Sequence, residues 1–404
     1  MTKVKTNIMK KYFIIAIAAV AAMGACSRNE INDARPESPI HFSVINHIQQ
    51  TKATAGLEYP KTVPFGSYAW WTADPWTAAT TDQNFVFMNN QKVAYDNTNK
   101  EWAPTTAFYW TKTGYITFAS YSPYTEEGTD NGYSVIPTYD VAKGFLFNNY
   151  TIVDNTDVDL MYANLAADCT KNTNVNGADV TDDTDPEGGF SGVPTVFNHA
   201  LCQIGFEFRA IGRKNPNVSE IKIVLNDVDI KNIDKKGSFT QIPASGEKWV
   251  SDHTVAANLA DYDYAPASAL ELSLIENTAE NIAKTNNYTA LGKTRILLPQ
   301  ELEEDDDPSD LTVDPIATTT DQKLVVNYTI KIKYTSAPDV WATEEVTSEV
   351  RLNNGTITAW RDNQNITYRI SINPYSTRPV TFDPAVVDWT DIFSTDVNLN
   401  QFDD

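Results

Sequence analysis

Carboxylates are the most abundant reactive groups in this sequence. The 404 residues include 53 Asp and Glu against 31 Lys and Arg, giving a formal net charge of -22 and a pI of about 4.5. Such a charge repels phosphate backbones and anionic lipid headgroups. Nucleic acid is therefore excluded as a partner, and any attachment to a membrane has to come from something other than electrostatic attraction.

Two short acidic segments offer the oxygen ligands that calcium prefers. They comprise Asp179, Asp182, Asp183 and Asp185 in the first, and residues 303–307 in the second. Neither segment has the ligand spacing or the turn glycine of an EF-hand. We interpret both as solvated surface loops, with calcium binding as the alternative. The sequence predicts no other metal and no cofactor.

The histidines give little support for catalysis. His41 and His47 fall on the polar side of an alternating segment, and His199 is expected to serve as a structural hydrogen-bonding residue. The sequence contains no GxSxG elbow, HExxH pair, P-loop or dinucleotide-binding fingerprint. A glycosidase-like pair of carboxylates depends on separation in space, which spacing along the chain does not reveal. The sequence predicts a protein that is not an enzyme.

The first cysteine follows a secretory signal. Lys10 and Lys11 precede an apolar run from Tyr12 to Met23, and two small residues then lead to Cys26. The run is about half as long as a membrane-spanning helix requires, and this order of segments is that of a signal peptide. The tetrapeptide Met-Gly-Ala-Cys resembles a bacterial lipobox. We therefore expect residues 1–25 to be removed and Cys26 to carry lipid, with a plain signal peptide as the alternative.

The two other cysteines differ in their surroundings. Cys202 shares strand parity with Ile204, Phe206 and Phe208, which places it in a core, whereas Cys169 lies in a polar stretch that reads as a loop. An exported pair of cysteines is able to form a disulfide. Because one is expected inside and the other outside, a disulfide is the less favoured interpretation.

Tryptophans suggest a second kind of chemistry, the stacking of aromatic rings on sugars. Trp70, Trp71 and Trp76 cluster in the sequence, and Trp76 follows Pro75 in a segment rich in Thr and Ala. Core packing is the commoner role of such rings, because each one buries a large area. We expect Trp76 at least to be exposed, and glycan binding by these three residues remains the alternative to a core role.

The elements that position these groups are predicted to be strands. Apolar residues alternate with polar ones at Ile40–Ile48, Tyr115–Tyr121, Leu324–Tyr334 and Ile366–Ile372, a period typical of sheets with one wet face. Ser268–Lys284 is compatible with either a short helix or a strand. The sequence therefore predicts an all-β fold made of two stacked antiparallel sandwiches.

Composition divides the chain. Residues 26–37 are polar and charged and contain Pro36, so we expect a tether, and residues 172–192 are rich in Asp, Asn, Thr and Gly. We place the first domain at 38–190 and the second at 193–404.

Several segments, taken in order, resemble the fimbrillin family of Bacteroidetes, the pilins of type V pili. Besides the lipobox, they are Pro39–Ser43, Thr51–Thr54, Phe108–Trp110, Gly114–Pro123, Asp159–Ala163, Val196–Leu201, Leu297–Gln300, and Val380–Asp383 with Trp389. The resemblance implies two transthyretin-like antiparallel β-sandwich domains, lipoprotein export to the outer membrane and the cell surface, and other pilin subunits as partners. It predicts a structural subunit of the pilus, shaft or accessory, that supports adhesion. The alternative is a lipid-anchored glycan-binding protein.

The resemblance also implies an assembly route. In this family a trypsin-like surface protease cuts after Arg or Lys behind the first strand, which then leaves a groove for a strand from another subunit. Lys52 is the expected cleavage site, and the alternative for this residue is an uncut loop lysine. Arg35 is the alternative cleavage site, although Pro36 hinders cutting there. The strand to be displaced carries Ile40, Phe42, Val44 and Ile48. The expected donor segment, 386–404, carries Trp389, Ile392, Val397, Leu399 and Phe402.

Overall fold

The fold of the chain is described by a computed structural model. It describes residues 39–46, 59–77, 85–130, 132–152, 158–171, 173, 192–213, 215–303, 322–353, 355–375 and 380–388. Within them nearly every regular element is a strand, and the helices are short turns such as α2 (Ala279–Ala283). No helix in the described part of the chain has the length and apolarity needed to cross a membrane. The predicted all-β class is confirmed.

The first sheet closes on itself. Its strands are β1 (Phe42–Asn46), β2 (Phe65–Thr72), β3 (Val86–Asp96), β4 (Glu101–Pro104), β5 (Tyr115–Ser122), β8 (Met161–Ala163), β9 (Ala166–Cys169) and β10 (Val193–His199). They pair in the order β2-β3-β4-β1-β10-β8-β5-β9, and β2 also pairs with β5. The strands from β2 round to β5 therefore form a closed ring. The smaller apolar cluster of the protein lies among them.

The second sheet is larger and mixed. It contains β11 (Cys202–Gly212), β12 (Val218–Asp234), β15 (Leu259–Asp263), β16 (Leu270–Glu276), β17 (Thr289–Leu297), β19 (Lys323–Tyr334), β20 (Ala337–Arg351), β22 (Gln364–Ile372) and β23 (Val380–Asp388). Its main order is β20-β19-β12-β16-β11-β22-β23, with β15 on β12 and β17 on β11. A two-stranded sheet, β18 (Gln300–Glu301) with β21 (Ala359–Trp360), lies apart from it.

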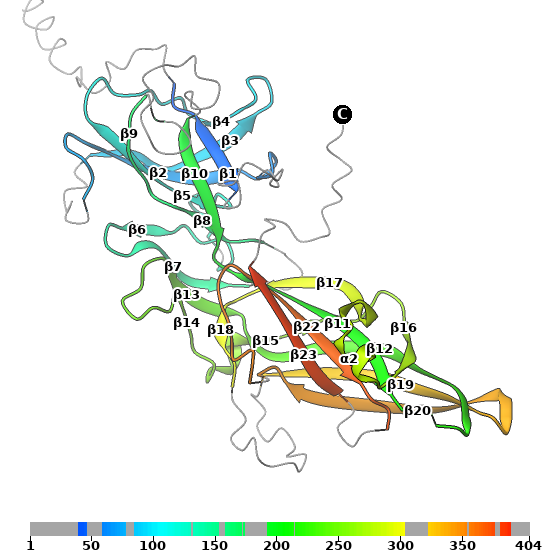
Figure 1. The fold of residues 1–404 in the computed structure, drawn as a ribbon. Helices are drawn as coiled ribbons and strands as arrows, with labels where there is room; N and C mark the ends of the chain where they lie inside the picture. The colour runs from blue at the N-terminus through cyan, green and yellow to red at the C-terminus, as the bar shows by residue number, and fades with distance from the viewer. Residues whose placement is uncertain are drawn as a thin grey trace, which may run out of the picture.

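A small sheet joins the two halves of the chain. Strands β6 (Thr138–Asp140) and β7 (Gly144–Thr151) pair with β13 (Lys236–Thr240) and β14 (Trp249–Ser251), in the order β14-β13-β7-β6. Figure 1 shows these strands between the first sheet and the second. The larger apolar cluster accordingly includes residues of both halves, from Trp70 to Ile372. The larger core is therefore built from residues of both halves of the chain.

The predicted domain boundary differs from the observed pairing. We placed the start of the second domain at residue 193, but Val193 begins β10, which pairs with β1 and β8 of the first sheet. The chain crosses to the second sheet only between His199 and Cys202. The loop composition before Val193 marks a long connection, and such a connection can lie within one sheet as well as between two.

The expectation of purely antiparallel sheets is wrong at three pairs. β1 runs parallel to β10, and β11 runs parallel to both β16 and β22. Alternation of apolar and polar residues reports one covered face of a strand, and it carries no information on the direction of the neighbouring strand. The predicted strands themselves are present, and β19 spans Lys323–Tyr334 as the alternation predicts.

Candidate functional site: the first strand and its neighbours

The first strand is internal to the ring. On one side β1 runs parallel to β10, from Phe42 opposite Val193 to Asn46 opposite Phe197. On the other side it pairs with β4 through Phe42 and Trp102. Figure 1 shows β1, in blue, beside the green β10. Because β1 has a neighbour on each side, its removal would open the ring and expose the edges of both β4 and β10.

The side chains of β1 are part of the smaller apolar cluster. Ile40 and Phe42 are buried, with exposed fractions of 1% and 3%, and Val44 packs against the same cluster while half-exposed. The ring of Phe42 makes edge-to-face contacts with Phe65 and Phe118, at centroid distances of 5.4 and 5.5 Å. Such contacts are favourable beyond the area they bury. Ile48 lies outside the described residues.

Two backbone features hold the start of β1. The N–H of Ile40 donates to the carbonyl oxygen of Phe108 at 2.8 Å, and the N–H of Val193 donates to that of His41 at 2.9 Å. Gly192 has a φ of +92°, and a Cβ there would lie 2.6 Å from the carbonyl oxygen of His41. Glycine is needed here because the chain has a left-handed conformation and also approaches β1 closely.

The chain after β1 returns to the same core. Tyr59 is buried, stacks on Phe197 at 5.0 Å, and its hydroxyl is hydrogen-bonded to Ser122 Oγ at 2.5 Å. Burial raises the pKa of this tyrosine well above its ordinary value. The expected cleavage site, Lys52, lies between β1 and Tyr59 in the sequence. Lys52, its alternative Arg35, and the expected lipidation site Cys26 all lie outside the described residues.

The last described strand belongs to the second sheet. β23 pairs antiparallel with β22 along its whole length, from Val380 opposite Ile372 to Asp388 opposite Gln364. Residues 386–388, which we assigned to the donor segment, are thus paired within their own chain. The residues that we expect to form the rest of the donor segment lie outside the described residues: Trp389, Ile392, Val397, Leu399 and Phe402.

Comparison with known proteins identifies the family to which this sequence belongs. A family model described as fimbrillin-like matches residues 65–389. The chain belongs to the fimbrillin-like family. No curated protein matches the sequence. A fimbrial protein from Bacteroides vulgatus has a similar structure, with a TM-score of 0.55 and 19% identity, over 87% of this chain and 99% of that one. At this identity the likeness concerns the fold alone.

Two further solved structures align over most of this fimbrillin-like chain. A candidate cell adhesion protein from Bacteroides uniformis aligns with 14% identity and a TM-score of 0.40, over 87% of this chain and 99% of that one. The tip fimbrial protein Mfa3 from Porphyromonas gingivalis aligns with 9% identity and a TM-score of 0.29, over 81% of this chain and 94% of that one. At these TM-scores neither structure informs the argument.

The tryptophan cluster of this fimbrillin-like chain lies mostly in a core. Trp70 is 3% exposed and its ring lies 4.9 Å from Tyr139, which agrees with the core role and gives no support to the alternative of glycan contact. Trp76 is half-buried rather than exposed, 5.7 Å from Trp70, and its backbone N–H donates to Asp168. Trp71 is half-buried, and its Nε1 donates to the carbonyl oxygen of Thr113. Packing therefore accounts for the cluster.

Cys169 and Cys202 are both buried, and no disulfide joins them in the described part of the chain. Cys202 is in the core as its parity predicts, and burial raises the pKa of its thiol. The prediction that Cys169 lies in a loop is wrong, because it ends β9 at 1% exposure. The residues around Cys169 are polar, so no alternation of apolar and polar residues indicated this short strand. Burial keeps the thiol of Cys202 protonated, so this thiol is not placed to act as a nucleophile.

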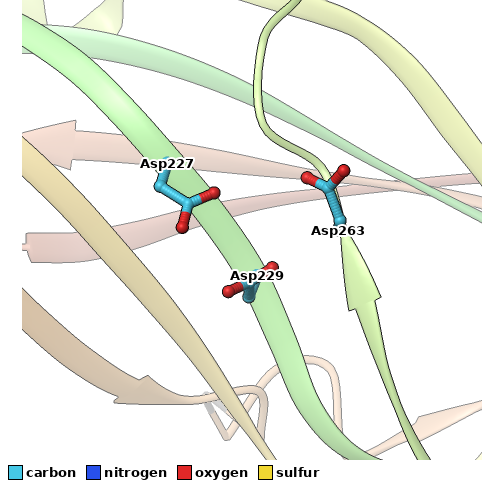
Figure 2. Close-up of side chains that lie close together, drawn as sticks. All are labelled: Asp227, Asp229 and Asp263. Carbon is cyan, nitrogen blue, oxygen red and sulfur yellow. The ribbon is translucent and has the colours of Figure 1, made fainter.

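Three carboxylates of the second sheet lie close enough to share a cation. Asp227 and Asp229 of β12 and Asp263 at the end of β15 have oxygens within 4.8 Å of one another (Figure 2). Lysines already neutralise two of them, because Lys231 is 3.0 Å from Asp229 and Lys293 is 3.0 Å from Asp263. The group is therefore better described as a set of ion pairs. Of the predicted calcium ligands, Glu303 is hydrogen-bonded through its backbone to Gln322, and the others lie outside the described residues.

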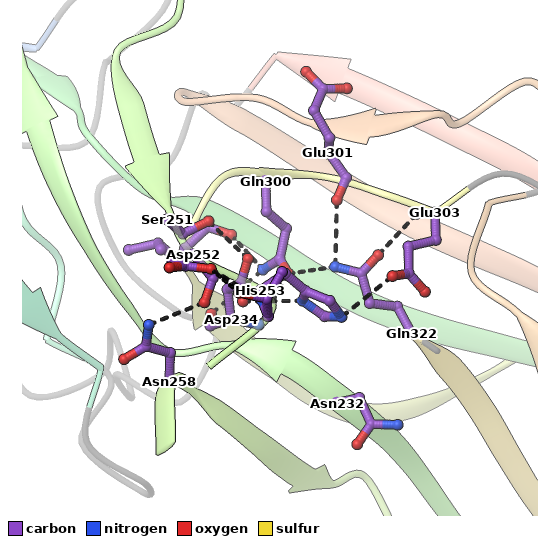
Figure 3. Close-up of polar contacts among 12 residues, drawn as sticks. Asn232, Asp234, Ser251, Asp252, His253, Asn258, Gln300, Glu301, Glu303 and Gln322 are labelled. Carbon is purple, nitrogen blue, oxygen red and sulfur yellow. Dashed lines mark hydrogen bonds and ion pairs between the residues drawn. The ribbon is translucent and has the colours of Figure 1, made fainter. Parts of the chain in front are cut away.

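A polar network with serine, histidine and aspartate lies beside β14. The carboxylate of Asp234 is buried and accepts from Ser251 Oγ at 2.7 Å, while His253 Nδ1 lies 3.0 Å from it (Figure 3). Nε2 of His253 lies 3.7 Å from Glu303. In a catalytic triad the serine is hydrogen-bonded to the histidine. Here the serine and the histidine both bond to the aspartate, so the arrangement ties the end of β12 to the end of β14 and does not activate the serine.

Proposed function

We propose that this fimbrillin-like protein is a structural subunit of a type V pilus, shaft or accessory, that supports adhesion. It is exported as a lipoprotein on Cys26 to the outer membrane and assembles by protease-triggered exchange of β1 for a strand of another subunit. The position of β1 carries the proposal, because it is an internal strand of a closed ring and the chain leads from it directly into the Lys52 segment.

The energetics of β1 favour exchange over simple loss. Burial of Ile40 and Phe42 stabilises the fold by about 1.5–3 kcal/mol for each side chain, and whole domains are stable by only about 5–15 kcal/mol. A ring without β1 would also expose unpaired backbone on β4 and β10. An incoming strand with apolar residues at alternate positions would restore both the pairing and the burial. The emptied ring would thus bind a strand of another subunit.

Lipidation and cleavage have complementary roles in this scheme. Several acyl chains on Cys26 would anchor the exported subunit durably. Cleavage after Lys52 would separate the body of the protein from the lipid and would allow β1 to leave with it. An uncut subunit would stay attached through Cys26 and would act as an anchor or accessory component.

The proposal is tested on protein recovered from the surface of the native bacterium. We expect intact-mass and N-terminal analysis to show a parent chain that begins at Ala53 and forms ladders in gels without boiling. Lys52→Ala should keep the lipid-bearing N-terminus and should not form ladders. Lys61→Ala is the matched control, because it removes a nearby exposed lysine, and it should behave as the parent.

Two results would contradict the shaft role. A parent chain that always begins at Cys26 and stays monomeric on the cell surface excludes assembly by cleavage, and leaves only a lipid-anchored accessory subunit. Ladders formed by Lys52→Ala as readily as by the parent would show that cleavage at this lysine does not control exchange.

A further inference from the structure

Three parallel strands end together at the pole of the second sheet that lies far from the first. β16 and β22 both run parallel to β11, so the ends of all three strands meet at one edge. The residues that follow these ends are Arg213, Asn277 and Asn373, which are far apart in the sequence. The N–H of Asn277 donates to the carbonyl oxygen of Gly212 at 3.0 Å, which ties two of the ends together.

These strand ends line an open hollow of about 480 Å³. Its lining residues are Arg213, Asn215, Pro216, Asn277, Asn373 and Tyr375. A second hollow of about 210 Å³ adjoins it and shares Asn215 and Tyr375. The volume of the first hollow falls within the range of about 300–1,000 Å³ that is usual for small-ligand sites.

The polar groups of the hollow are held in fixed orientations. Oδ1 of Asn373 accepts from the backbone N–H of Tyr375 at 3.1 Å, and Oδ1 of Asn215 accepts from that of Asn217 at 3.0 Å. Gly212 leaves room for this arrangement, since a Cβ there would lie 3.1 Å from Asn373 Oδ1 and 3.4 Å from the ring of Tyr375. Side chains fixed in this way lose little entropy when a ligand binds.

An exposed aromatic ring completes the site. Tyr375 is 44% exposed, and Tyr334, which is 43% exposed, lies close enough to help raise the pKa of the Tyr375 hydroxyl after partial burial. The loop at Asn217 also holds the end of β19, because the N–H of Thr335 donates to its carbonyl oxygen at 2.9 Å. Large exposed rings beside amides form an amphipathic surface, and such a surface suits a ligand with one apolar face and a polar rim.

We propose that this hollow, which we name the Tyr375 site, binds a neutral glycan. The ring of Tyr375 would stack on the C–H face of one sugar, and the side chains of Asn277, Asn373 and Arg213 would bond to its hydroxyls. Amide groups both donate and accept, as hydroxyls do. In the adjoining hollow Lys222 and Lys333 neutralise Glu220, each at 3.5 Å, and it is the carboxylate of Glu276 that disfavours a phosphorylated or sulfated ligand. The site is distinct from Trp70, Trp71 and Trp76, and it lies far from β1 (Figure 1).

The test applies fluorescently labelled full chain to an array of immobilised neutral oligosaccharides with their sialylated and sulfated counterparts. We expect binding to a subset of the neutral ones. Tyr375→Ala should weaken solution affinity for the best of them by about two- to tenfold, as expected for one lost stacking contact. Asn277→Ala, a change at an exposed side chain, should weaken it in the same direction. Tyr109→Ala is the matched control, since Tyr109 is 38% exposed and belongs to the first half of the chain.

Several outcomes would overturn the proposal. They are a parent chain that binds no glycan, binding restricted to charged glycans, and correctly folded Tyr375→Ala and Asn277→Ala variants that bind as the parent does. An equal loss with Tyr109→Ala would show that the Tyr375 site is not responsible. The experiment uses unassembled chain, so its result does not depend on strand exchange or on pilus formation.

Discussion

A buried, hydrogen-bonded histidine and aspartate lie where the chain passes from the first sheet to the second. His199 ends β10, and its Nδ1 lies 2.7 Å from Oδ2 of Asp159, as the expected hydrogen-bonding role of this histidine requires. Oδ1 of Asp159 is buried and has no hydrogen-bond partner among the described residues. Burial raises the pKa of Asp159, and the neighbouring His199 only partly opposes this effect. This contact holds the connection between the two sheets in place, although it leaves the carboxylate of Asp159 poorly solvated.

The raised pKa of Asp159 predicts a pH dependence of stability. Because the folded state holds this proton more tightly than the unfolded state does, stability from this group is greatest below its ordinary pKa of 3.8 and falls as the pH rises toward the folded value. Asp159→Asn should flatten the decrease in melting temperature that the parent shows from about pH 4 upward. Thermal unfolding followed by circular dichroism over a pH series measures this.

Asp96 provides a control of opposite sign. The backbone N–H of Thr98 lowers the pKa of this exposed carboxyl, so its stabilisation is present above the ordinary pKa of 3.8 and is lost as the pH falls. Asp96→Asn should therefore remove an increase in stability with pH rather than a decrease. If Asp159→Asn kept the slope of the parent, the buried carboxyl would not be the source of the pH dependence.

At the scale of elements, the sequence predicted strands better than their partners. β19 and β22 were visible because each has one apolar and one polar face, which produces a period of two. β9 was missed because Cys169 is surrounded by polar residues. The parallel partner of β1 depends on a connection of well over a hundred residues, and no local pattern records it. The Tyr375 site was invisible for the same reason, because only the parallel pairing of β11, β16 and β22 brings its residues together.

The contact between Gly192 and β1 predicts how tightly the first strand is held. Gly192→Ala would place a Cβ 2.6 Å from the carbonyl oxygen of His41 in addition to imposing a left-handed conformation on alanine. We expect a loss of about 1–3 kcal/mol in stability. Hydrogen exchange should show lost protection at the N–H of Val193, which donates to His41 in the parent.

Gly128→Ala separates the two causes. Gly128 has a similar φ of +84°, but a Cβ there would meet nothing within 4 Å. Gly128→Ala should lower stability only by the cost of the left-handed conformation of alanine. It should leave the hydrogen exchange of the Val193 N–H unchanged. Equal losses in the two variants would mean that close approach to β1 contributes nothing.

At the scale of the whole molecule, a lysine connects parts that are distant in the sequence. Nζ of Lys248, which precedes β14, lies 2.8 Å from the hydroxyl of Tyr162 in β8 and 2.6 Å from Oδ2 of Asp362 in the turn before β22. The adjacent Trp249 donates through Nε1 to the carbonyl oxygen of Ala200 in the crossing. Lys248 thus links the first sheet, the joining sheet and the second sheet. Strain applied to one half of the chain would be transmitted to the other here, which is relevant to a subunit under tension.

Removal of this link should make the two halves unfold less cooperatively. Lys248→Met keeps the aliphatic stem and removes both charged hydrogen bonds. We therefore expect the free energy of unfolding to fall by about 1.5–3 kcal/mol. Lys293→Met is the matched control, because the two lysine side chains have the same exposed fraction of 29% and Lys293 pairs only with Asp263 among the described residues. Lys293→Met should lower the free energy of unfolding by no more than about 1 kcal/mol.

Calorimetry should show a broadened or split transition for Lys248→Met alone. A single sharp transition with an unchanged midpoint would show that the apolar cluster, and not Lys248, couples the two halves.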